Sequence, residues 1–452
     1  MNNKKNVFMI GLNEFNFEKL KSLPDFDSYN FYGLIPPEEA EDANQYDIDD
    51  MFNRLESELN NFNGSVDAIV TYIDFPISMM VPILCKKYNL PAASLESILK
   101  CHHKYWGRLE QEKVAKENVP GFNKVDPFAD NPLSQVDLKF PFWLKPVKSV
   151  GSYLGFRVEN KKQFNEYIEV IRREIGRMAG PFNNLLKRAE LPDEIKDVDG
   201  HFCIAEEIIG GRQCTLEGFV LNGEVKLHGV IDSIRHPNKS TFARYVYPSK
   251  LPRQVQDRMY EITKNVLTQK GYNNSAFNVE FFWNKSKDKI WLLEVNTRVS
   301  QSHSDLFEKV DGASNHKITI DVGLGKEPNF PYRKGNFKKA AKFFYRKWED
   351  AIVTRIPTQD EVEAIENDIP GTLIQVKPDE GQRLSEMNEQ DSYSYELVWL
   401  FLAGKDENDL QRKYDECVKR LKFEFKPVSD NVPVGVVEGH ENKPAESEDD
   451  LV

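Results

Sequence analysis

The chain has 452 residues, of which 40% are hydrophobic and 29% are charged, and its formal net charge is −12. This length supports two to four domains with cores of their own, and the composition is that of an ordinary globular protein. The excess of acidic residues argues against a general nucleic-acid binder and against a protein that binds anionic membrane surfaces.

The cysteines and the hydropathy pattern argue against disulfide-bonded, zinc-binding, membrane-spanning and secreted proteins. The five cysteines are widely spaced, odd in number and form no CxxC pair, so they indicate neither a disulfide framework nor a zinc site. No apolar run approaches the roughly 18 residues of a membrane span. The first residues lead into a short strand rather than into a signal-peptide core, so we expect a cytoplasmic protein.

Residues 1–102 alternate between strands and helices. Strands are predicted at residues 7–12, 31–35 and 66–72, and helices at 17–23, 51–60 and 78–88. This alternation predicts a parallel, Rossmann-like sheet. Only Gly11 follows the first strand, without a GxGxxG motif, so we expect no dinucleotide site in this domain.

The rest of the chain mixes helices with paired strands. The predicted elements are helices at 99–118, 161–177, 253–270 and 407–421 and strands at 140–146, 156–158, 201–209, 214–221, 224–234, 277–283 and 290–298. Asn222-Gly223 is a strong hairpin turn, and Gly271 is placed to end a helix. Residues 331–430 are mixed α/β, and residues 431–452 are predicted to be an acidic, disordered tail.

Two alternating runs around the polar turn 284–289 predict a β-hairpin with oxygen ligands on one face. Asn278 and Glu280 share a face of the first strand, and Glu294 and Asn296 share a face of the second. The residues predicted to face a core are Phe277, Val279, Phe281, Trp291, Leu293 and Val295. Mg²⁺ prefers such oxygen ligands and commonly binds substrate phosphates as well. A simply solvated polar face is the alternative.

Two further segments have the residues expected of a nucleotide-binding site. The loop 148–155 contains Gly151 and Ser152, whose small side chains let backbone N–H groups approach phosphate oxygens. Lys145 ends an apolar strand, so its charge must reach an anion or solvent. In the segment 205–218, the backbone N–H and C=O groups of a strand edge could bind adenine, and glutamate side chains could accept hydrogen bonds from its amino group and from the ribose hydroxyls. Taken alone, each is also compatible with a plain glycine-rich turn or connector.

In this order, the segments resemble the ATP-grasp superfamily, and specifically its carboxylate–amine ligase branch, over about residues 103–325. The motifs are Lys104 with Arg108, Val119-Pro-Gly121, Trp143-Leu-Lys145-Pro, the loop to Gly155, the segment from Glu206 to Gln213, Asn278-Val-Glu280 and Glu294-Val-Asn296-Thr-Arg298. The resemblance implies an α/β and α+β fold. Its parts are an N-terminal Rossmann-like domain (1–102), an ATP-grasp region (103–330) with a lid at about 140–207, and a C-terminal α+β lobe (331–430).

The resemblance also implies ATP and Mg²⁺ as cofactors, with Mn²⁺ as a substitute, and a role for each motif residue. Lys104, Lys145, Gly151 and Ser152 would lie around the ATP phosphates, and Glu206, Glu207, the backbone of Ile208, and Gln213 would hold adenine and ribose. Glu280, Glu294 and Asn296 would bind Mg²⁺, and Arg298 and Lys145 would be catalytic. Two positions depart from the family pattern: Gln213 replaces a common glutamate, and Thr297 replaces the usual proline.

The implied reaction is ATP-dependent amide or peptide bond formation, in which a carboxylate is activated as an acyl phosphate and attacked by an amine. We therefore expect small-molecule substrates, and a homodimer is compatible with the sequence. Arg235, His236, Arg244 and His303 are the candidates for substrate contact, because arginine clamps carboxylates and histidine titrates near neutrality. Exposed loop charges are the alternative for these residues. We expect His102 and His103 to be structural or exposed.

Two other functions fit the same sequence. One is a biotin-carboxylase-like enzyme that uses bicarbonate, which the C-terminal lobe permits. The other is a regulatory protein that binds a nucleotide at a degenerate site, although the nearly complete set of ligands argues against it.

Overall fold

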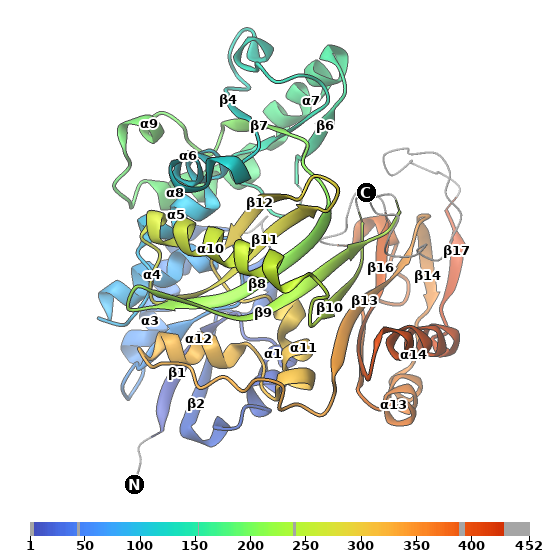
Figure 1. Cartoon of the computed structure of the whole chain (residues 1–452). Helices are drawn as coiled ribbons and strands as arrows, with labels where there is room; N and C mark the ends of the chain where they lie inside the picture. Colours follow the sequence, from blue (N-terminus) through green and yellow to red (C-terminus); the bar gives the residue numbers. More distant parts are fainter. Residues whose placement is uncertain (1–3, 43–45, 152, 238–240, 388–393, 429–452) are drawn as a thin grey trace.

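A computed structural model of the chain describes residues 4–42, 46–151, 153–237, 241–387 and 394–428. The predicted acidic tail and Ser152 lie outside the described residues. Figure 1 shows the blue N-terminal domain at one side of a central sheet, a small subdomain at one end, and the orange and red C-terminal part at the other side. This arrangement confirms the predicted α/β and α+β fold class.

The N-terminal domain is built on a three-stranded parallel sheet with the order β2-β1-β3. Its elements are β1 (Lys5–Ile10), α1 (Glu14–Lys21), β2 (Tyr29–Leu34), α2 (Pro37–Glu41), α3 (Ile48–Asn61), β3 (Ala68–Val70), α4 (Ile77–Lys87) and α5 (Leu95–His102). The middle strand β1 pairs in parallel with both neighbours, which confirms the predicted Rossmann-like sheet. Its residues from Val7 to Ile10 are at most 2% exposed, as the apolar run of a buried parallel strand requires.

The single helix predicted over residues 99–118 is wrong, because two helices meet at His103. Helix α5 ends at His102, and α6 (Lys104–Ala115) begins two residues later. His103 has extended backbone angles, with φ −80° and ψ 98°, and its Nδ1 accepts a hydrogen bond from the backbone N–H of Trp106. The imidazole thus caps α6, and the break places Lys104 in the first turn of that helix.

A small four-stranded sheet with the order β4-β7-β5-β6 forms the subdomain at the top of Figure 1. Its strands and the adjoining helices are β4 (Phe122–Val125), β5 (Phe142–Pro146), β6 (Phe156–Val158), α7 (Lys161–Glu174), α8 (Gly176–Leu186), α9 (Asp193–Lys196) and β7 (Cys203–Glu207). The helix predicted over 161–177 corresponds to α7, which ends three residues earlier, and a break at Ile175 separates it from α8. Helix α7 shares a separate core with this sheet, whereas α8 packs into the large core with the N-terminal domain.

An eight-stranded antiparallel sheet runs through the centre of the molecule in the order β12-β11-β8-β9-β10-β13-β16-β15. Its strands are β8 (Arg212–Leu221), β9 (Glu224–Arg235), β10 (Phe242–Tyr247), β11 (Ser275–Asn284), β12 (Lys289–Asn296), β13 (Lys339–Lys347), β15 (Thr372–Val376) and β16 (Tyr395–Gly404). Strands β13, β15 and β16 belong to the segment predicted as a C-terminal lobe. The sheet is thus continuous across the boundary predicted at residue 330.

Helices pack on both faces of this sheet. The remaining elements are α10 (Arg253–Lys270), α11 (Gln301–Asp311), α12 (His316–Gly323), β14 (Ala351–Arg355), α13 (Gln359–Asp368), α14 (Glu407–Arg420) and β17 (Glu424–Pro427). Helix α11 packs on the face that carries Tyr247 and Phe401, and α14 packs on the opposite face with Phe343 and Leu402. Among the described residues, no helix has the length and apolar content that a membrane span requires.

Candidate active site

The predicted hairpin is confirmed, because β11 and β12 pair in antiparallel fashion. Glu280 lies directly opposite Glu294, and Asn278 lies directly opposite Asn296. Side chains at paired positions point to the same face of a sheet. The four polar side chains that the sequence singled out therefore share one face.

A β-bulge corrects the prediction for the apolar side of this hairpin. The register shifts after Glu280, and Leu293 becomes the extra residue. Ile290 and Leu292 are buried as a result, whereas Trp291 and Leu293, which were predicted to face the core, are only partly buried. Because the shift lies beyond Glu280, the pairing of the polar side chains is unaffected.

Hydrogen bonds hold the polar face of the hairpin in place. Asn296 Nδ2 donates to Asn278 Oδ1 at 3.3 Å and to Glu280 Oε1 at 3.2 Å. Asn278 Nδ2 donates to Glu217 Oε1 at 3.1 Å, and Gln213 Nε2 donates to Glu280 Oε2 at 2.9 Å. Since the amide nitrogen of Asn296 points into this network, its carbonyl oxygen points away from it.

Glu217, which was not among the predicted site residues, anchors the network. It is fully buried, its Oε1 lies 2.6 Å from His303 Nδ1, and its Oε2 accepts a hydrogen bond from Asn315 Nδ2 at 2.9 Å. Burial alone would raise the pKa of Glu217, but the adjacent His228 and His303 rings hold that pKa well below its usual range. Glu217 is a charged residue within the largely apolar strand β8. A charge at such a position was the feature of the sequence from which its role could have been predicted.

The two facing carboxylates of the hairpin suit a cation. Burial and the charge of Glu294 raise the pKa of Glu280, because two adjacent carboxylates repel each other. The described residues contain no group of three or more His, Cys, Asp or Glu side chains that could hold a metal ion. Two carboxylates and the Asn296 carboxamide are instead the donor set expected for Mg²⁺, whose remaining ligands are commonly water and phosphate oxygens.

Two predicted lysines lie near this hairpin. Lys104 Nζ is 3.8 Å from Glu294 Oε1 and donates to the backbone carbonyl of Ser149 at 3.1 Å. Burial lowers the pKa of Lys104, and Glu294 opposes that effect. Lys145, on β5, places its Nζ 2.5 Å from Glu206 Oε2. Strands β12 and β5 and the start of helix α6 thus place charged side chains close to the polar face of the hairpin.

Glu206 is held by two cations in this conformation. Its Oε1 accepts a hydrogen bond from Arg108 Nε at 2.6 Å, and its Oε2 pairs with Lys145. Burial would raise the pKa of Glu206, but Arg108 and Lys145 outweigh burial and hold the pKa at about 2. An adenine contact from this position therefore requires either the backbone or the displacement of one cation.

We expect Glu206→Gln to lower the free energy of unfolding at pH 7 by about 3 kcal/mol, because the variant leaves Arg108 and Lys145 without their counter-charge. Glu206 has a depressed pKa in the folded state, so its contribution is present above the ordinary value of 4.5 and is lost as the pH falls toward about 2. Urea unfolding at pH 7 and pH 3 measures the difference, with exposed Glu261→Gln as the control. An equal loss of stability at both pH values contradicts this assignment.

Arg298, just beyond the hairpin, reaches the N-terminal domain. Its Nη2 lies 2.9 Å from Asp74 Oδ2, and Lys148 Nζ lies 3.7 Å from Asp74 Oδ1. Asp74 and Lys148 were not among the predicted site residues. Asp74 follows the carboxyl end of buried strand β3, where α/β folds commonly bind ligands, and that position was the available signal. Lys148 had a weaker one, as a second lysine shortly after Lys145.

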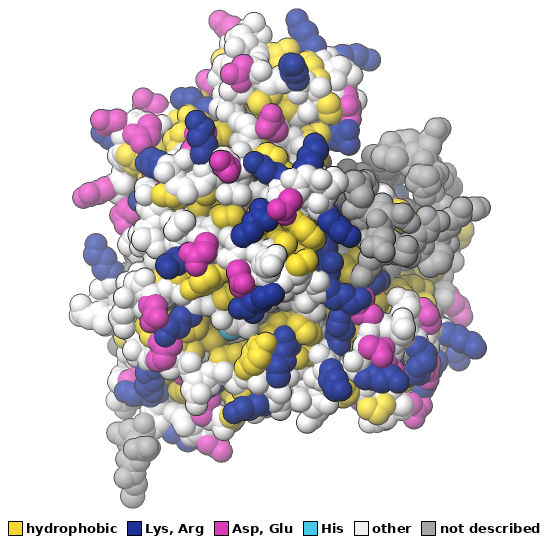
Figure 2. Space-filling view, in the orientation of Figure 1, with side chains coloured by type: hydrophobic (Ala, Val, Ile, Leu, Met, Phe, Trp, Pro, Cys, Tyr) yellow, Lys and Arg dark blue, Asp and Glu magenta, His cyan; other side chains and the backbone are white. Residues whose placement is uncertain are grey.

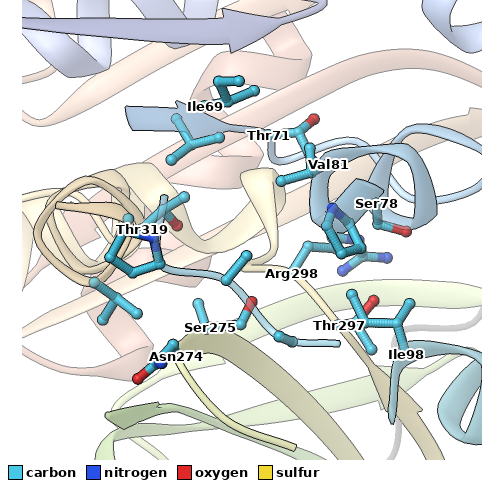
Figure 3. Close-up of a pocket in the computed structure, with 18 residues that line it drawn as sticks. Ile69, Thr71, Ser78, Val81, Ile98, Asn274, Ser275, Thr297, Arg298 and Thr319 are labelled. Carbon is cyan, nitrogen blue, oxygen red and sulfur yellow. The ribbon is translucent and has the colours of Figure 1, made fainter. Parts of the chain in front are cut away.

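A cavity of about 50 Å³ lies beside Arg298, between the N-terminal domain and the start of β11. Figure 3 shows Arg298 and Thr297 near Ser78 and Ile98, with Thr319 on the opposite side of the cavity. The lining is mainly apolar, with a few hydroxyl groups. The residues that follow the hairpin therefore lie beside the N-terminal domain at this cavity.

Comparison with known families agrees with this geometry: residues 138–304 match the family model described as an ATP-grasp domain. This part of the chain is an ATP-grasp domain. The predicted resemblance to the ATP-grasp superfamily is thereby confirmed for these residues. A comparison of the sequence with curated proteins gives no match.

The structure of the whole chain is similar to several solved structures. L-amino acid ligase from Bacillus licheniformis has a TM-score of 0.66 and 14% identity, over 94% of this chain and 99% of that chain. Phosphoribosylglycinamide synthetase from Anaerococcus prevotii has a TM-score of 0.62 and 15% identity, over 94% and 100%. Biotin carboxylase from Campylobacter jejuni, in a β-γ-ATP complex, has a TM-score of 0.60 and 14% identity, over 93% and 92%. At these identities the similarity establishes the fold alone.

The other predicted nucleotide contacts of the ATP-grasp domain lie near the small sheet. Gly151 has a φ of +53° with open space around it, so the loop after Lys148 is not packed at this point. Glu207 Oε2 accepts a hydrogen bond from the Gly121 N–H at 2.8 Å, and Ile208 beyond β7 is 38% exposed. The predicted adenine contact of Ile208 is through its backbone, which lies just beyond the end of β7.

Two of the four substrate candidates lie on the polar face of the central sheet. Arg235 Nε donates to Gln213 Oε1 at 2.8 Å, so Arg235 extends the hydrogen-bond network that includes Glu280. His303, on α11, binds Glu217 and packs edge to face against Tyr245 with ring centroids 5.2 Å apart. Both side chains are therefore close to the hairpin.

The other two candidates have different surroundings. Arg244 lies in strand β10 rather than in the predicted loop, and its register partner is Phe343. Its guanidinium lies 5.7 Å from the centroid of the Phe343 ring, in the core shared with α14. The alternation of β10 thus turns Arg244 away from Glu280. His236 packs edge to face against Trp348 at 5.2 Å.

Proposed function

We propose that the chain is an ATP- and Mg²⁺-dependent ligase, which activates a small-molecule carboxylate as an acyl phosphate and joins it to an amine. The observation that carries this proposal is the grouping of Glu280, Glu294 and Asn296 opposite Lys104 and beside Arg298, in an ATP-grasp domain. The similarity of the fold to an L-amino acid ligase makes amino acids the first carboxylates to test.

In the first step, a carboxylate oxygen of the substrate attacks the γ-phosphorus of ATP, and ADP leaves. Catalysis of this step consists mainly of positioning and charge neutralisation. Lys104 and Lys145 would bind phosphate oxygens, and Glu280, Glu294 and Asn296 would hold Mg²⁺. The metal, when bound, would supply charge neutralisation at the triphosphate.

In the second step, the amine attacks the carbonyl carbon of the acyl phosphate, phosphate leaves, and the nitrogen loses a proton. The carbonyl oxygen carries negative charge in the transition state. Arg298 would stabilise that charge with its fixed guanidinium, which Asp74 orients at 2.9 Å. Arg235 and His303 are the candidates for contacts with the substrate side chains.

An acyl phosphate also reacts with water, so the site must exclude solvent during turnover. The small sheet with α7 has a separate core, and it carries Lys145 and the loop that contains Gly151. We infer that this subdomain is the lid that closes over bound ATP.

Acyl phosphate formation can be tested without knowledge of the natural amine. Hydroxylamine captures an acyl phosphate as a hydroxamate, so the enzyme is incubated with ATP, Mg²⁺, hydroxylamine and single amino acids or other carboxylates. We expect hydroxamate and ADP to form in equal amounts with the correct carboxylate and to disappear when Mg²⁺ is chelated. The absence of carboxylate-stimulated ADP release across the panel, both with hydroxylamine and with amine pairs, rules out the proposed reaction.

The same assay separates the alternative functions. ADP release that requires bicarbonate and free biotin indicates a carboxylase-like reaction instead. ADP binding without turnover under any condition indicates a nucleotide-binding regulatory protein.

A further inference from the structure

Lys148 and Arg298 share a single carboxylate. Arg298 Nη2 is 2.9 Å from Asp74 Oδ2, and Lys148 Nζ is 3.7 Å from Asp74 Oδ1. Among the described residues, Asp74 is the one carboxylate that forms an ion pair with either cation. The Lys148 side chain is only 4% exposed, so solvent does little to compensate its charge. Within ion-pair distance, the two cations therefore share one carboxylate, whereas Glu280 and Glu294, the candidate metal ligands, act on them from further away.

The neighbouring groups add no second carboxylate within ion-pair distance of Lys148 or Arg298 among the described residues. Lys104 is paired with Glu294 at 3.8 Å, and Glu294 acts on Lys148 only from beyond that distance. Burial and the charge of Lys148 lower the pKa of His102 well below its usual value, so the imidazole is neutral. Burial also lowers the pKa of Lys148 to about 8, with Asp74 opposing the shift. A cationic site of this kind is stabilised when an anion binds to it.

We propose that Lys148 and Arg298 form the subsite for the carboxylate of the substrate, and that His102 is a positioning residue for Lys148. The subsite lies next to the hairpin that carries the candidate metal ligands, so a carboxylate held there would be close to the phosphates. This inference rests on the proposed ligase function and adds the place where the acid binds.

His102 connects the two cations through its two ring nitrogens. Its Nδ1 lies 2.9 Å from Lys148 Nζ, and its Nε2 lies 2.8 Å from Thr297 Oγ1 and 3.3 Å from Ser78 Oγ. An ammonium group only donates hydrogen bonds, so Nδ1 accepts and the ring proton resides on Nε2, which donates to Thr297. The threonine that replaces the usual proline before Arg298 thus supplies a hydroxyl acceptor for His102.

The first test measures the KM for the activating carboxylate in the hydroxamate assay. We expect Lys148→Met to raise this KM by about 10- to 100-fold, because a charged hydrogen bond to the carboxylate is lost. The affinity for MgADP, measured by calorimetry, is expected to stay unchanged. An unchanged KM overturns the proposal, and so does an equal loss of MgADP affinity, which would make Lys148 a ligand of the nucleotide phosphates.

The second test separates the two contacts of His102. His102→Asn retains a polar atom near the Nδ1 position, toward Lys148, whereas His102→Gln retains one near the Nε2 position, toward Thr297 and Ser78. We expect His102→Gln to raise the KM for the carboxylate about 10-fold and His102→Asn to restore most of that loss. Equal KM values for both variants, at equal melting temperatures, contradict a positioning role for His102. If both variants fail to fold, the Lys148→Met measurement still decides the subsite.

The activity of the unmodified protein tests the ligase proposal, and the KM of Lys148→Met tests the carboxylate subsite separately. If the unmodified protein shows no carboxylate-stimulated ADP release, the ligase proposal fails. If the unmodified protein is active and Lys148→Met leaves the KM for the carboxylate unchanged, only the subsite is wrong.

Discussion

Replacement of Glu294 by glutamine is expected to lower Mg²⁺-dependent ADP release by about 10³-fold, because the variant removes one of two carboxylates that would hold the metal. The expected loss of folding stability is small. The Glu294 side chain is 42% exposed, and its ion pair with Lys104 is 3.8 Å long. The effect on turnover can therefore be separated from an effect on folding.

The measurement is ADP release at increasing Mg²⁺ concentrations, with Glu261→Gln on the exposed side of α10 as the matched control. We expect a higher Mg²⁺ requirement for Glu294→Gln and normal behaviour for the control. Full activity of Glu294→Gln at the Mg²⁺ concentration that saturates the unmodified enzyme would falsify the assignment of this carboxylate as a metal ligand.

Replacement of Arg298 by methionine is expected to lower kcat by about 10²- to 10³-fold, because the guanidinium would no longer stabilise the developing oxyanion. If Arg298 also binds the substrate carboxylate, the KM for that substrate rises as well. MgADP affinity is expected to be retained, since the predicted nucleotide contacts lie on other residues.

Two further variants test whether the loss of kcat is specific to the guanidinium of Arg298. Arg298→Lys keeps the charge but not the planar fork, so we expect partial recovery of kcat. Arg253→Met removes an exposed arginine at the start of α10 and serves as the control. Comparable kcat values for Arg298→Met and the unmodified enzyme are incompatible with a catalytic role for this arginine.

Local elements with strong sequence signals were predicted with accurate boundaries. Helix α10 covers Arg253–Lys270 as predicted, and Gly271 ends it with a φ of +67°. The turn Asn222-Gly223 has φ values of 51° and 82° between β8 and β9, as a turn with two left-handed residues requires. These features depend on neighbouring residues, and the sequence contains that information directly.

Boundaries set by single long-range contacts were not predicted. The break at His103 interrupts a stretch with good helical pattern, and its ring also binds the carbonyl of Val198, far away in the sequence. The bulge at Leu293 depends on how β12 pairs with β11, and it exchanged the environments of Trp291 and Leu292. His102 was expected to be structural or exposed; it is buried between Lys148 and Thr297, and these two partners could not be read from the sequence.

The sequence by itself determined the hairpin, the order of its polar residues and the resemblance to the ATP-grasp superfamily, because strand alternation and motif order are local properties of the chain. The tertiary structure decided which charges meet. It brought Asp74 from the end of β3, Lys148 from the loop after β5 and Arg298 from beyond β12 to one place, and it turned Arg244 to the other face of the sheet. Such meetings depend on how separate sheets pack, and no local pattern encodes that packing.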